Sequence, residues 1–282
     1  MIRDLRLKRK KVLQKIIIGF VVLATVFVFD FWIFMPKTSS NVLSEEGLEP
    51  VPRTEPLVNE FNVIEPEITK EEQAGEIKEE IKEEVDLEVP FTVQAPFAVW
   101  DDLHNEACEE ATLIMAEYWR SNRLLTLEQA EKEIQSLVKW QIENWGGHYD
   151  LNIKRVKELA QEYFKMDKIY FTQVEETNDV RKELNKGSLV ILPTAGRLLK
   201  NPYYKTPGPA YHMLVVKGYK DDEFITNDPG TKKGKDFIYK EDILLNAIHD
   251  WPLESEKNCE LDKDQKAQEV LKGDKIMLVV EK

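Results

Sequence analysis

Apolar and polar positions divide the chain into three stretches. Residues 1–36 contain an unbroken apolar run, residues 37–88 show no sustained apolar period, and residues 89–282 mix helical and alternating patterns. The run from Ile16 to Met35 (IIIGFVVLATVFVFDFWIFM) is twenty residues long, and its one charge, Asp30, lies near the distal end. A helix of that length spans about 30 Å, which matches the hydrocarbon core of a bilayer. We therefore expect a single transmembrane helix at residues 16–35, in contact with lipid.

Basic residues precede the apolar run and predict its orientation. Residues 1–15 contain seven Lys or Arg and one Asp. The positive-inside rule keeps this stub in the cytoplasm and places the rest of the chain outside it. A cleaved signal peptide is the alternative, but its apolar core would be only about 7–15 residues long, followed by a small-residue cleavage site. Only Thr38-Ser39-Ser40 offers such a site. We expect an uncleaved, single-pass anchor with an extracytoplasmic C-terminal domain.

Residues 37–88 are predicted to be an acidic, proline-containing, disordered linker. Sixteen Asp or Glu and only five Lys or Arg lie between residues 37 and 89, together with four prolines. Such a segment repels itself and stays extended. The stretch 71–88 also allows a transient helix, with Ile77, Ile81 and Val85 on one face, so a partner-binding helix is an alternative.

Beyond Val89 the chain changes from helical periods to strand periods. Apolar spacing predicts helices at residues 108–121, 126–145 and 152–164. The second of these has a capping box, Thr126 with Gln129, and a stop at Gly146-Gly147. Apolar runs predict strands at residues 168–173, 188–194, 211–219, 223–228, 237–239 and 275–281, with short helices near 179–186 and 240–249.

Helices followed by strands are typical of an α+β fold, with N-terminal helices packed on a mostly antiparallel sheet. Two regions stand apart from this pattern. Residues 195–210 contain two glycines and three prolines and predict a long irregular loop of the kind that often lines sites. Residues 253–272 are polar and charged and predict an exposed helix or surface insertion.

Composition narrows the classes of function. The chain is 42% hydrophobic and 32% charged, which excludes a wholly disordered chain and a polytopic membrane protein. A net charge of −13 argues against a general nucleic-acid binder, which needs a basic face against phosphate. The two cysteines exclude a disulfide scaffold and the zinc motifs that need three or four cysteines.

One of the cysteines, Cys108, lies where a loop passes into the first predicted helix of the domain. The unfilled N–H groups and the dipole of a helix N-terminus favour a thiolate, which is the nucleophilic form. They also aim backbone donors at an oxyanion that forms beside the sulfur. Glu109 and Glu110 act in the opposite direction, so the thiol needs a cationic partner. A buried structural cysteine is the alternative interpretation.

His212 and Asp228 supply a partner and its support. His212 opens one predicted strand, Asp228 closes the next, and the turn between them lies near Asp221-Asp222. An antiparallel hairpin brings both residues to the same end of the strand pair, and an odd loop length also places them on one face. A carboxylate then fixes the imidazole tautomer and supports the imidazolium that pairs with a thiolate. A hydrogen-bonded strand-end histidine and a turn-forming aspartate remain the alternatives.

Gln94 is the fourth candidate, fourteen residues before Cys108 in an extended stretch that leads to the helix. Its side-chain amide and the Cys108 backbone N–H together would form an oxyanion hole. A zinc site is a further alternative, because His104, His148 and nearby acidic residues surround Cys108 in the sequence. The aromatic residues Trp100, Tyr203 and Tyr204 are candidate cleft residues.

The runs VPFTVQAPFAVWDDLHNEACEEATLIMAEYW and NPYYKTPGPAYHMLVVKGYKDDEFITNDPGT resemble the C-39-like cysteine peptidases. These are relatives of the peptidase domains on bacteriocin-exporting transporters and belong to the papain-like superfamily. The resemblance covers roughly residues 89–250. It implies a papain-like fold, with Cys108 as nucleophile, His212 as base, Asp228 as the orienting carboxylate and Gln94 in the oxyanion hole. It implies no cofactor and no metal.

Two features depart from the transporter-linked members. Their Gln-to-Cys spacing is shorter and their cysteine is followed by Gly-Pro, whereas Glu109 and Glu110 follow Cys108 here. The expected function is therefore a membrane-anchored, extracytoplasmic cysteine peptidase or amide hydrolase acting on a peptide or protein. A catalytically inactive binding module and a thiol-dependent transpeptidase are the alternatives. Cys259 is expected to be a free thiol or to form an intermolecular bond.

Overall fold

The computed structural model describes residues 81–252 and 260–282. The predicted transmembrane helix at residues 16–35, most of the predicted linker and Cys259 lie outside these ranges, so what we expect of them remains a prediction. Within the described ranges, no helix combines the length and the apolar character needed to cross a bilayer.

Helices dominate residues 102–162, and the apolar spacing predicts all of them except the first, which lies in the predicted loop before Cys108. The first four are α2 (Asp102–Asn105), α3 (Cys108–Arg120), α4 (Leu127–Trp145) and α5 (Ile153–Glu162). The predicted capping box of Thr126 and Gln129 opens α4, and Gly146 ends it in the left-handed region at φ 82°. Every residue of α3 from Cys108 to Trp119 is buried, so this helix forms the centre of the helical layer.

Seven strands form one sheet in which every pair is antiparallel. The order is β2-β7-β3-β4-β5-β6, and β1 pairs with the far end of β4. The bounds are β1 (Glu84–Asp86), β2 (Ile169–Gln173), β3 (Leu189–Thr194), β4 (His212–Lys220), β5 (Glu223–Asn227), β6 (Phe237–Lys240) and β7 (Ile276–Val280). The predicted α+β class with an antiparallel sheet is confirmed.

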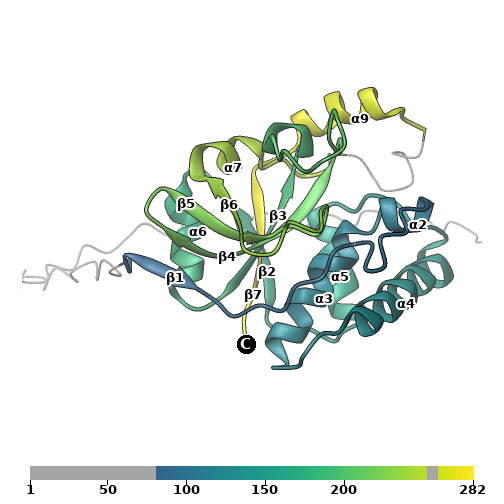
Figure 1. Ribbon diagram of the computed structural model, residues 1–282, viewed down its shortest axis with the longest axis horizontal. Coiled ribbons are helices and arrows are strands. Elements are labelled where there is room, and N and C mark those ends of the chain that lie inside the picture. The colour runs from purple at the N-terminus through teal and green to yellow at the C-terminus, as the bar shows by residue number, and fades with distance from the viewer. Residues whose placement is uncertain (1–80, 253–259) are drawn as a thin grey trace, which may run out of the picture. The chain divides into compact units, whose positions relative to one another are not determined.

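The central strands are buried on both faces. On β3, Leu189 and Ile191 pack with α3, α4 and α5, whereas Val190 and Leu192 pack with helices on the other face. Figure 1 shows α3, α4 and α5 together on one side of the sheet and α6 and α7 on the other. The other helices are α6 (Thr177–Asn185), η1 (Gly196–Leu199), α7 (Glu241–Ala247), α9 (Lys263–Glu269) and η2 (Val270–Lys272). This double burial explains why the strands appear as continuous apolar runs in the sequence.

The folded body begins earlier than residue 89, where the composition places the domain boundary. Residues Glu84–Asp86 form β1 and pair with residues 218–220 of β4. Asp86 also contacts the Lys217 ammonium group, and a main-chain bond joins Leu87 to Lys217. The acidic composition of residues 81–88 therefore reflects an exposed edge strand, because its carboxylates pair with lysines of β4.

The predicted loop at residues 195–210 and the predicted exposed helix or insertion at residues 253–272 both contain short helices. Residues 195–210 begin with the short helix η1, in which Leu199 is buried. Residues 263–272 form α9, which is exposed as predicted, and η2, in which Val270 is buried. Leu199 and Val270 help to anchor these two segments to the core.

Candidate active site

Cys108 is the first residue of α3, and its side chain is buried. The sulfur donates a hydrogen bond to Oε2 of Glu109 at 3.0 Å. The other carboxyl oxygen of Glu109 accepts from the backbone N–H of Leu151 at 2.8 Å. The carboxyl group is thus held between the thiol and the segment that precedes α5, and the thiol is in its protonated, hydrogen-bonding form.

The surroundings of this thiol disfavour its ionisation. Burial is the main cause that raises the pKa of Cys108 well above its ordinary value, and the charges of Glu109 and Asp150 raise it further. The backbone N–H of Met213 beside the sulfur acts in the opposite direction and lowers it. The helix N-terminus, which favours a thiolate, is therefore outweighed in this structure. Burial is the larger influence, and the predicted opposition from Glu109 adds to it.

His212 and Asp228 meet at one end of the β4–β5 hairpin, as predicted. Nε2 of His212 lies 2.8 Å from Oδ1 of Asp228, and both side chains are buried. A β-bulge between Val216 and Gly218 makes this possible. Beyond the bulge Val215 is opposite Asn227, so the next step places Asp228 opposite Leu214, on the same face as His212. Without the extra residue, Asp228 would point to the other face.

Asp228 accepts hydrogen bonds from four further donors. Oδ1 also accepts from the backbone N–H of Gly230 at 2.9 Å. Oδ2 accepts from Tyr204 at 2.6 Å, Tyr239 at 2.7 Å and Asn201 at 3.0 Å. Burial acts to raise the pKa of Asp228, but the charge of His212 and these hydrogen bonds lower it below its ordinary value. The carboxyl group is therefore ionised and fixed in orientation.

Gly230 is required by the close packing above this pair. A Cβ atom at Gly230 would lie 2.9 Å from His212 Cε1, 2.9 Å from Tyr204 Cε1 and 3.2 Å from Asp228 Oδ1. The N-D-P-G sequence thus forms a turn in which Asp228 accepts from Gly230 N–H, as its composition suggests, and at the same time holds His212. Asp228 therefore forms the turn and also binds His212, whereas its catalytic role remains a prediction.

Cys108 lies beside the start of β4, the strand that His212 opens. Met213 and Val215 face the cluster that contains Cys108, whereas Leu214, and by alternation His212, face the other side of the sheet. The sulfur lies against the Met213 N–H, the amide next to His212. In the described part of the chain, the sulfur is hydrogen-bonded to Glu109 and not to the imidazole.

Gln94 lies between the Cys108 and Asp228 segments. Its backbone N–H donates to Pro229 O at 2.9 Å, next to Asp228. Its side-chain amide donates to the carbonyls of His104 at 2.8 Å and Asn105 at 3.2 Å, shortly before Cys108. Both amide hydrogens are thus used here.

The residues considered as zinc ligands have separate partners. His104 binds Asp101 at 2.7 Å and Glu131 at 3.1 Å, and His148 lies 3.3 Å from Glu110. Over residues 81–252 and 260–282, no three His, Cys, Asp or Glu side chains are grouped as metal ligands. The acidic residues instead form ion pairs behind the thiol, where Lys266 binds Asp150 at 2.6 Å and lies 3.9 Å from Glu106.

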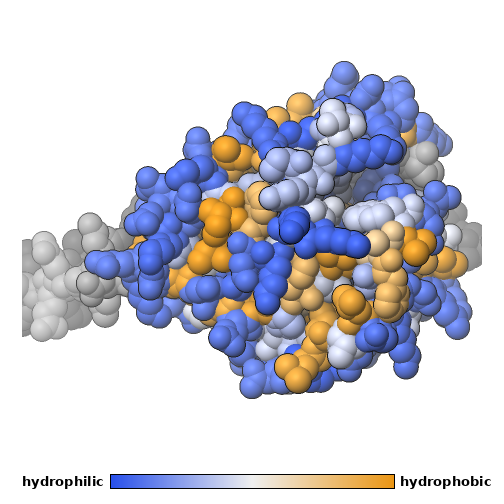
Figure 2. Space-filling model, viewed as in Figure 1, coloured by the Kyte–Doolittle hydropathy of each residue, from blue (hydrophilic) through white to orange (hydrophobic). Residues whose placement is uncertain are grey.

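The aromatic candidates occupy different positions. Tyr204 contacts the His212–Asp228 pair, Tyr203 is 55% exposed, and Trp100 is exposed with Phe97 and Val99 in the loop between Gln94 and α2. Polar residues cover most of the face shown in Figure 2, with apolar residues exposed between them. This exposed apolar loop lies next to Gln94 in the sequence.

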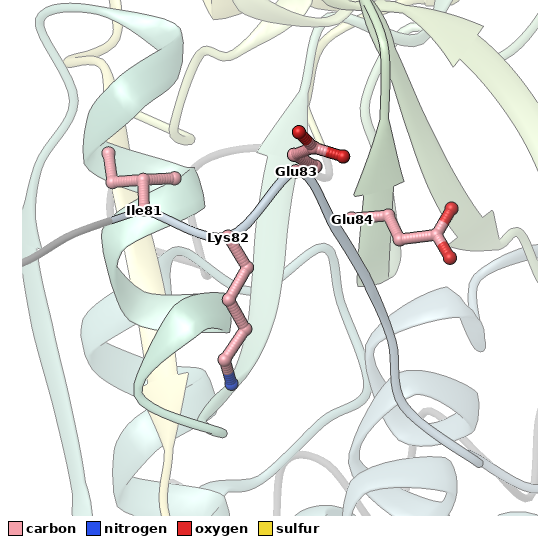
Figure 3. Close-up of a pocket in the computed structure, with 4 residues that line it drawn as sticks. All are labelled: Ile81, Lys82, Glu83 and Glu84. Atoms are coloured by element: carbon pink, nitrogen blue, oxygen red, sulfur yellow. The ribbon is translucent and has the colours of Figure 1, made fainter.

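A separate hollow lies at the start of β1. It is lined, within the described residues, by Ile81, Lys82, Glu83 and Glu84, all from one extended stretch (Figure 3). Figure 3 shows the side chains of Lys82 and Glu84 pointing away from each other. None of the candidate catalytic residues lines this hollow, so it has no part in the candidate site.

The sequence does not identify Asn201 and Tyr239 as site residues. Tyr239 is opposite Phe224 on the neighbouring strand, and its hydroxyl reaches Asp228 only because β5 and β6 pair in this register. Asn201 follows η1 in the predicted irregular loop and bonds both Asp228 and the Tyr239 hydroxyl, the latter at 2.8 Å. The composition of the proline-rich loop predicts that it lines a site, but it does not single out Asn201, and Tyr239 lies outside the loop.

One family profile matches more than half of the chain. The sequence profile of the Peptidase_C39 like family matches residues 86–251, which include Cys108, His212, Asp228 and Gln94. A crystal structure from Bacillus anthracis, named as a C39-like peptidase, is similar over 71% of this chain and 98% of its own, with 14% identity and a TM-score of 0.43. No curated protein matches the chain.

The contact between Cys108 and Glu109 predicts a measurable effect on thiol reactivity. In Glu109→Gln an amide that can donate to a thiolate replaces the buried carboxyl group, so the pH midpoint of iodoacetamide alkylation should fall by about one unit, and the rate below the midpoint should rise about tenfold. Peptide mass spectrometry separates Cys108 from Cys259. Glu110→Gln is the matched control, because Glu110 contacts Gln141 and His148 instead. A midpoint that does not move in Glu109→Gln contradicts this role of Glu109.

Two buried acidic groups should make the folded state less stable as the pH rises from acidic to neutral. Burial raises the pKa of Glu106 from 4.5 to about 7 and that of Asp250 from 3.8 to about 6. The folded state therefore holds protons that the unfolded chain releases, and this stability is lost as the pH rises through 6 to 7. We expect the Tm to fall by about 2–4 °C from pH 5 to pH 8.

Glu106→Gln should reduce this pH dependence, because the amide does not titrate. Glu128→Gln in the first turn of α4 is the control, since Glu128 is exposed. Thermal unfolding at several pH values measures the effect. A Tm that rises steadily from pH 5 to pH 8 would contradict the assignment.

Proposed function

Because the chain belongs to the Peptidase_C39 like family, we propose that it is a cysteine peptidase or amide hydrolase with the triad Cys108, His212 and Asp228. The observation that carries the proposal is the buried 2.8 Å hydrogen bond from His212 to Asp228, formed where β4 begins beside the sulfur. An imidazole held by a carboxylate next to a thiol at a helix N-terminus is the arrangement that thiol catalysis needs.

The first chemical step uses the ring nitrogen of His212 that Asp228 does not bind. Since Nε2 is bonded to Asp228, Nδ1 accepts the proton when the sulfur turns from Glu109 toward the imidazole. The thiolate attacks the carbonyl carbon of an amide and forms a tetrahedral oxyanion. As the C–N bond breaks, the imidazolium gives its proton to the leaving amine, and a thioester on Cys108 remains.

Two N–H donors are proposed to stabilise the oxyanion. The Cys108 backbone N–H belongs to the first turn of α3, where amides have no partner within the helix. The Gln94 amide is the second donor, after it releases the longer of its two bonds, to Asn105. Donors aimed at the developing charge stabilise the transition state more than the ground state.

Water completes the proposed reaction. His212 takes a proton from the water, the resulting hydroxide attacks the thioester, and the thiol returns to Cys108 as the acid product leaves. An amine in place of water would give transpeptidation with the same residues. The substrate is proposed to be a peptide or protein, and every step uses groups of this chain.

We also propose that the reaction takes place outside the cytoplasm, on a domain anchored by residues 16–35. The support is the twenty-residue apolar run and the basic residues before it. The acidic linker that follows would hold the domain away from the membrane surface.

A binding module without turnover is the second candidate function. The bond between the sulfur and Glu109, together with burial that raises the pKa of Cys108, favours it, because a thiol held in this way is a poor nucleophile. In such a module the domain would bind a peptide without cleaving it, and Cys108 would only fill space in the core.

Single-residue variants separate the two functions. Cys108→Ala and His212→Ala in the full chain should each lower hydrolysis of a peptide library by at least about 10³-fold, because triad residues act as a unit. Cys259→Ser, the other cysteine, should retain full activity. Cleavage is followed by mass spectrometry of the library. Equal residual activity in wild type and Cys108→Ala, with peptide binding retained, would support the module instead.

A further inference from the structure

We infer that Tyr204 and Tyr239 are positioning residues, which hold Asp228 in place and keep it a weak base, so that it orients His212 without taking its proton. The inference rests on the proposed function and concerns how the triad carboxylate is tuned. Neither tyrosine touches the sulfur or the reacting carbonyl in the proposed mechanism. Both act through Asp228.

The number of donors on Asp228 is larger than orientation of His212 requires. The two carboxyl oxygens offer about four lone-pair directions, and five donors approach them. Three of the five, from Tyr204, Tyr239 and Asn201, converge on Oδ2. This arrangement fixes the rotation of the carboxyl group and leaves Oδ1 aimed at His212 and Gly230.

The chemical type of the donors matters as much as their number. A lysine or arginine at Oδ2 would neutralise the carboxylate and weaken its support of an imidazolium. Phenol groups donate hydrogen bonds and leave the negative charge in place. Burial raises the pKa of Tyr204 and of Tyr239, and the charge of Asp228 raises both further. The two hydroxyls therefore stay protonated and remain donors.

The two tyrosines hold the carboxylate from different elements. Tyr239 lies on β6, whereas Tyr204 lies in the loop after η1 and also packs edge-on against the His212 ring, with centroids 5.5 Å apart. Asn201 links them, since its side-chain amide donates to Asp228 and the Tyr239 hydroxyl, and its backbone carbonyl accepts from the Tyr204 N–H at 3.2 Å. Tyr204 thus contacts both members of the pair and connects the long loop to the proposed catalytic base.

Removal of one phenol hydroxyl has a defined electronic consequence. Fewer donors leave more charge on Asp228 and make it more basic. The imidazole N–H then donates a stronger hydrogen bond to Asp228, and the proton is shared more evenly between the two groups. The orientation of the carboxyl group, and with it that of the ring, also becomes less constrained, although four donors remain in each variant.

The test is the resonance of the His212 Nε2 proton in the full chain, observed by ¹H NMR after ¹⁵N-histidine labelling. The chain has four histidines, and loss of the signal in Asp228→Asn assigns it. In Tyr204→Phe and in Tyr239→Phe the resonance should move downfield. Tyr203→Phe is the matched control, because Tyr203 is exposed and packs on Phe237, and its spectrum should match wild type.

Steady-state kinetics provide a second, independent test of the roles of Tyr204 and Tyr239. Each of Tyr204→Phe and Tyr239→Phe should lower kcat by about tenfold with KM little changed, because a hydrogen bond to a charged group is lost away from the substrate. A resonance unchanged in both variants overturns the inference and leaves the peptidase proposal intact. Absence of hydrolysis in wild type overturns the proposed function, and the NMR result, recorded also in Cys108→Ala, still decides whether the phenols tune Asp228.

Discussion

The hydrogen bond between His212 and Asp228 is the contact that most of the site depends on. It exists because a bulge in β4 brings Asp228 onto the face of His212, and because a glycine at position 230 leaves space above the pair. The strands that carry it are packed on both faces, so neither residue can shift without moving the core. A rigid sheet therefore provides the base and its support, and the helical layer provides the thiol.

The two halves of the site differ in their electrostatics. Around Asp228, five donors stabilise a buried negative charge. Around Cys108, burial and the carboxyl group of Glu109 oppose a negative charge on the sulfur. The thiol is therefore protonated and hydrogen-bonded to Glu109 instead of the imidazole. In the proposed mechanism, His212 is thus already oriented to act as the base, whereas the Cys108 thiol is not yet in its nucleophilic form. Proton transfer from sulfur to imidazole requires the sulfur to leave Glu109, a side-chain rotation that a bound substrate could favour by filling the space beside it.

Much of the architecture follows from local sequence patterns. The helices and strands match the apolar periods, because α3 and the central strands are buried and their periods are uninterrupted. The hairpin geometry that joins His212 to Asp228 also follows from the sequence, but the odd spacing it needs comes from a bulge at Lys217 that no local signal marks. The local sequence does not identify the edge strand β1, which lies in an acidic segment, because its stabilising partners, such as Lys217, are distant in sequence. Tyr239 and Asn201 depend on sheet register and loop path, which are properties of the whole fold.

The central claim is that Cys108 and His212 act on one carbonyl, and a crystal structure of the chain after reaction with a peptidyl electrophile tests it most directly. The account predicts a covalent bond to the Cys108 sulfur, loss of its contact with Glu109, and Nδ1 of His212 within about 4 Å of the sulfur. An unmodified Cys108, or a modified sulfur that still faces Glu109 with the imidazole on the other side of β4, would contradict it.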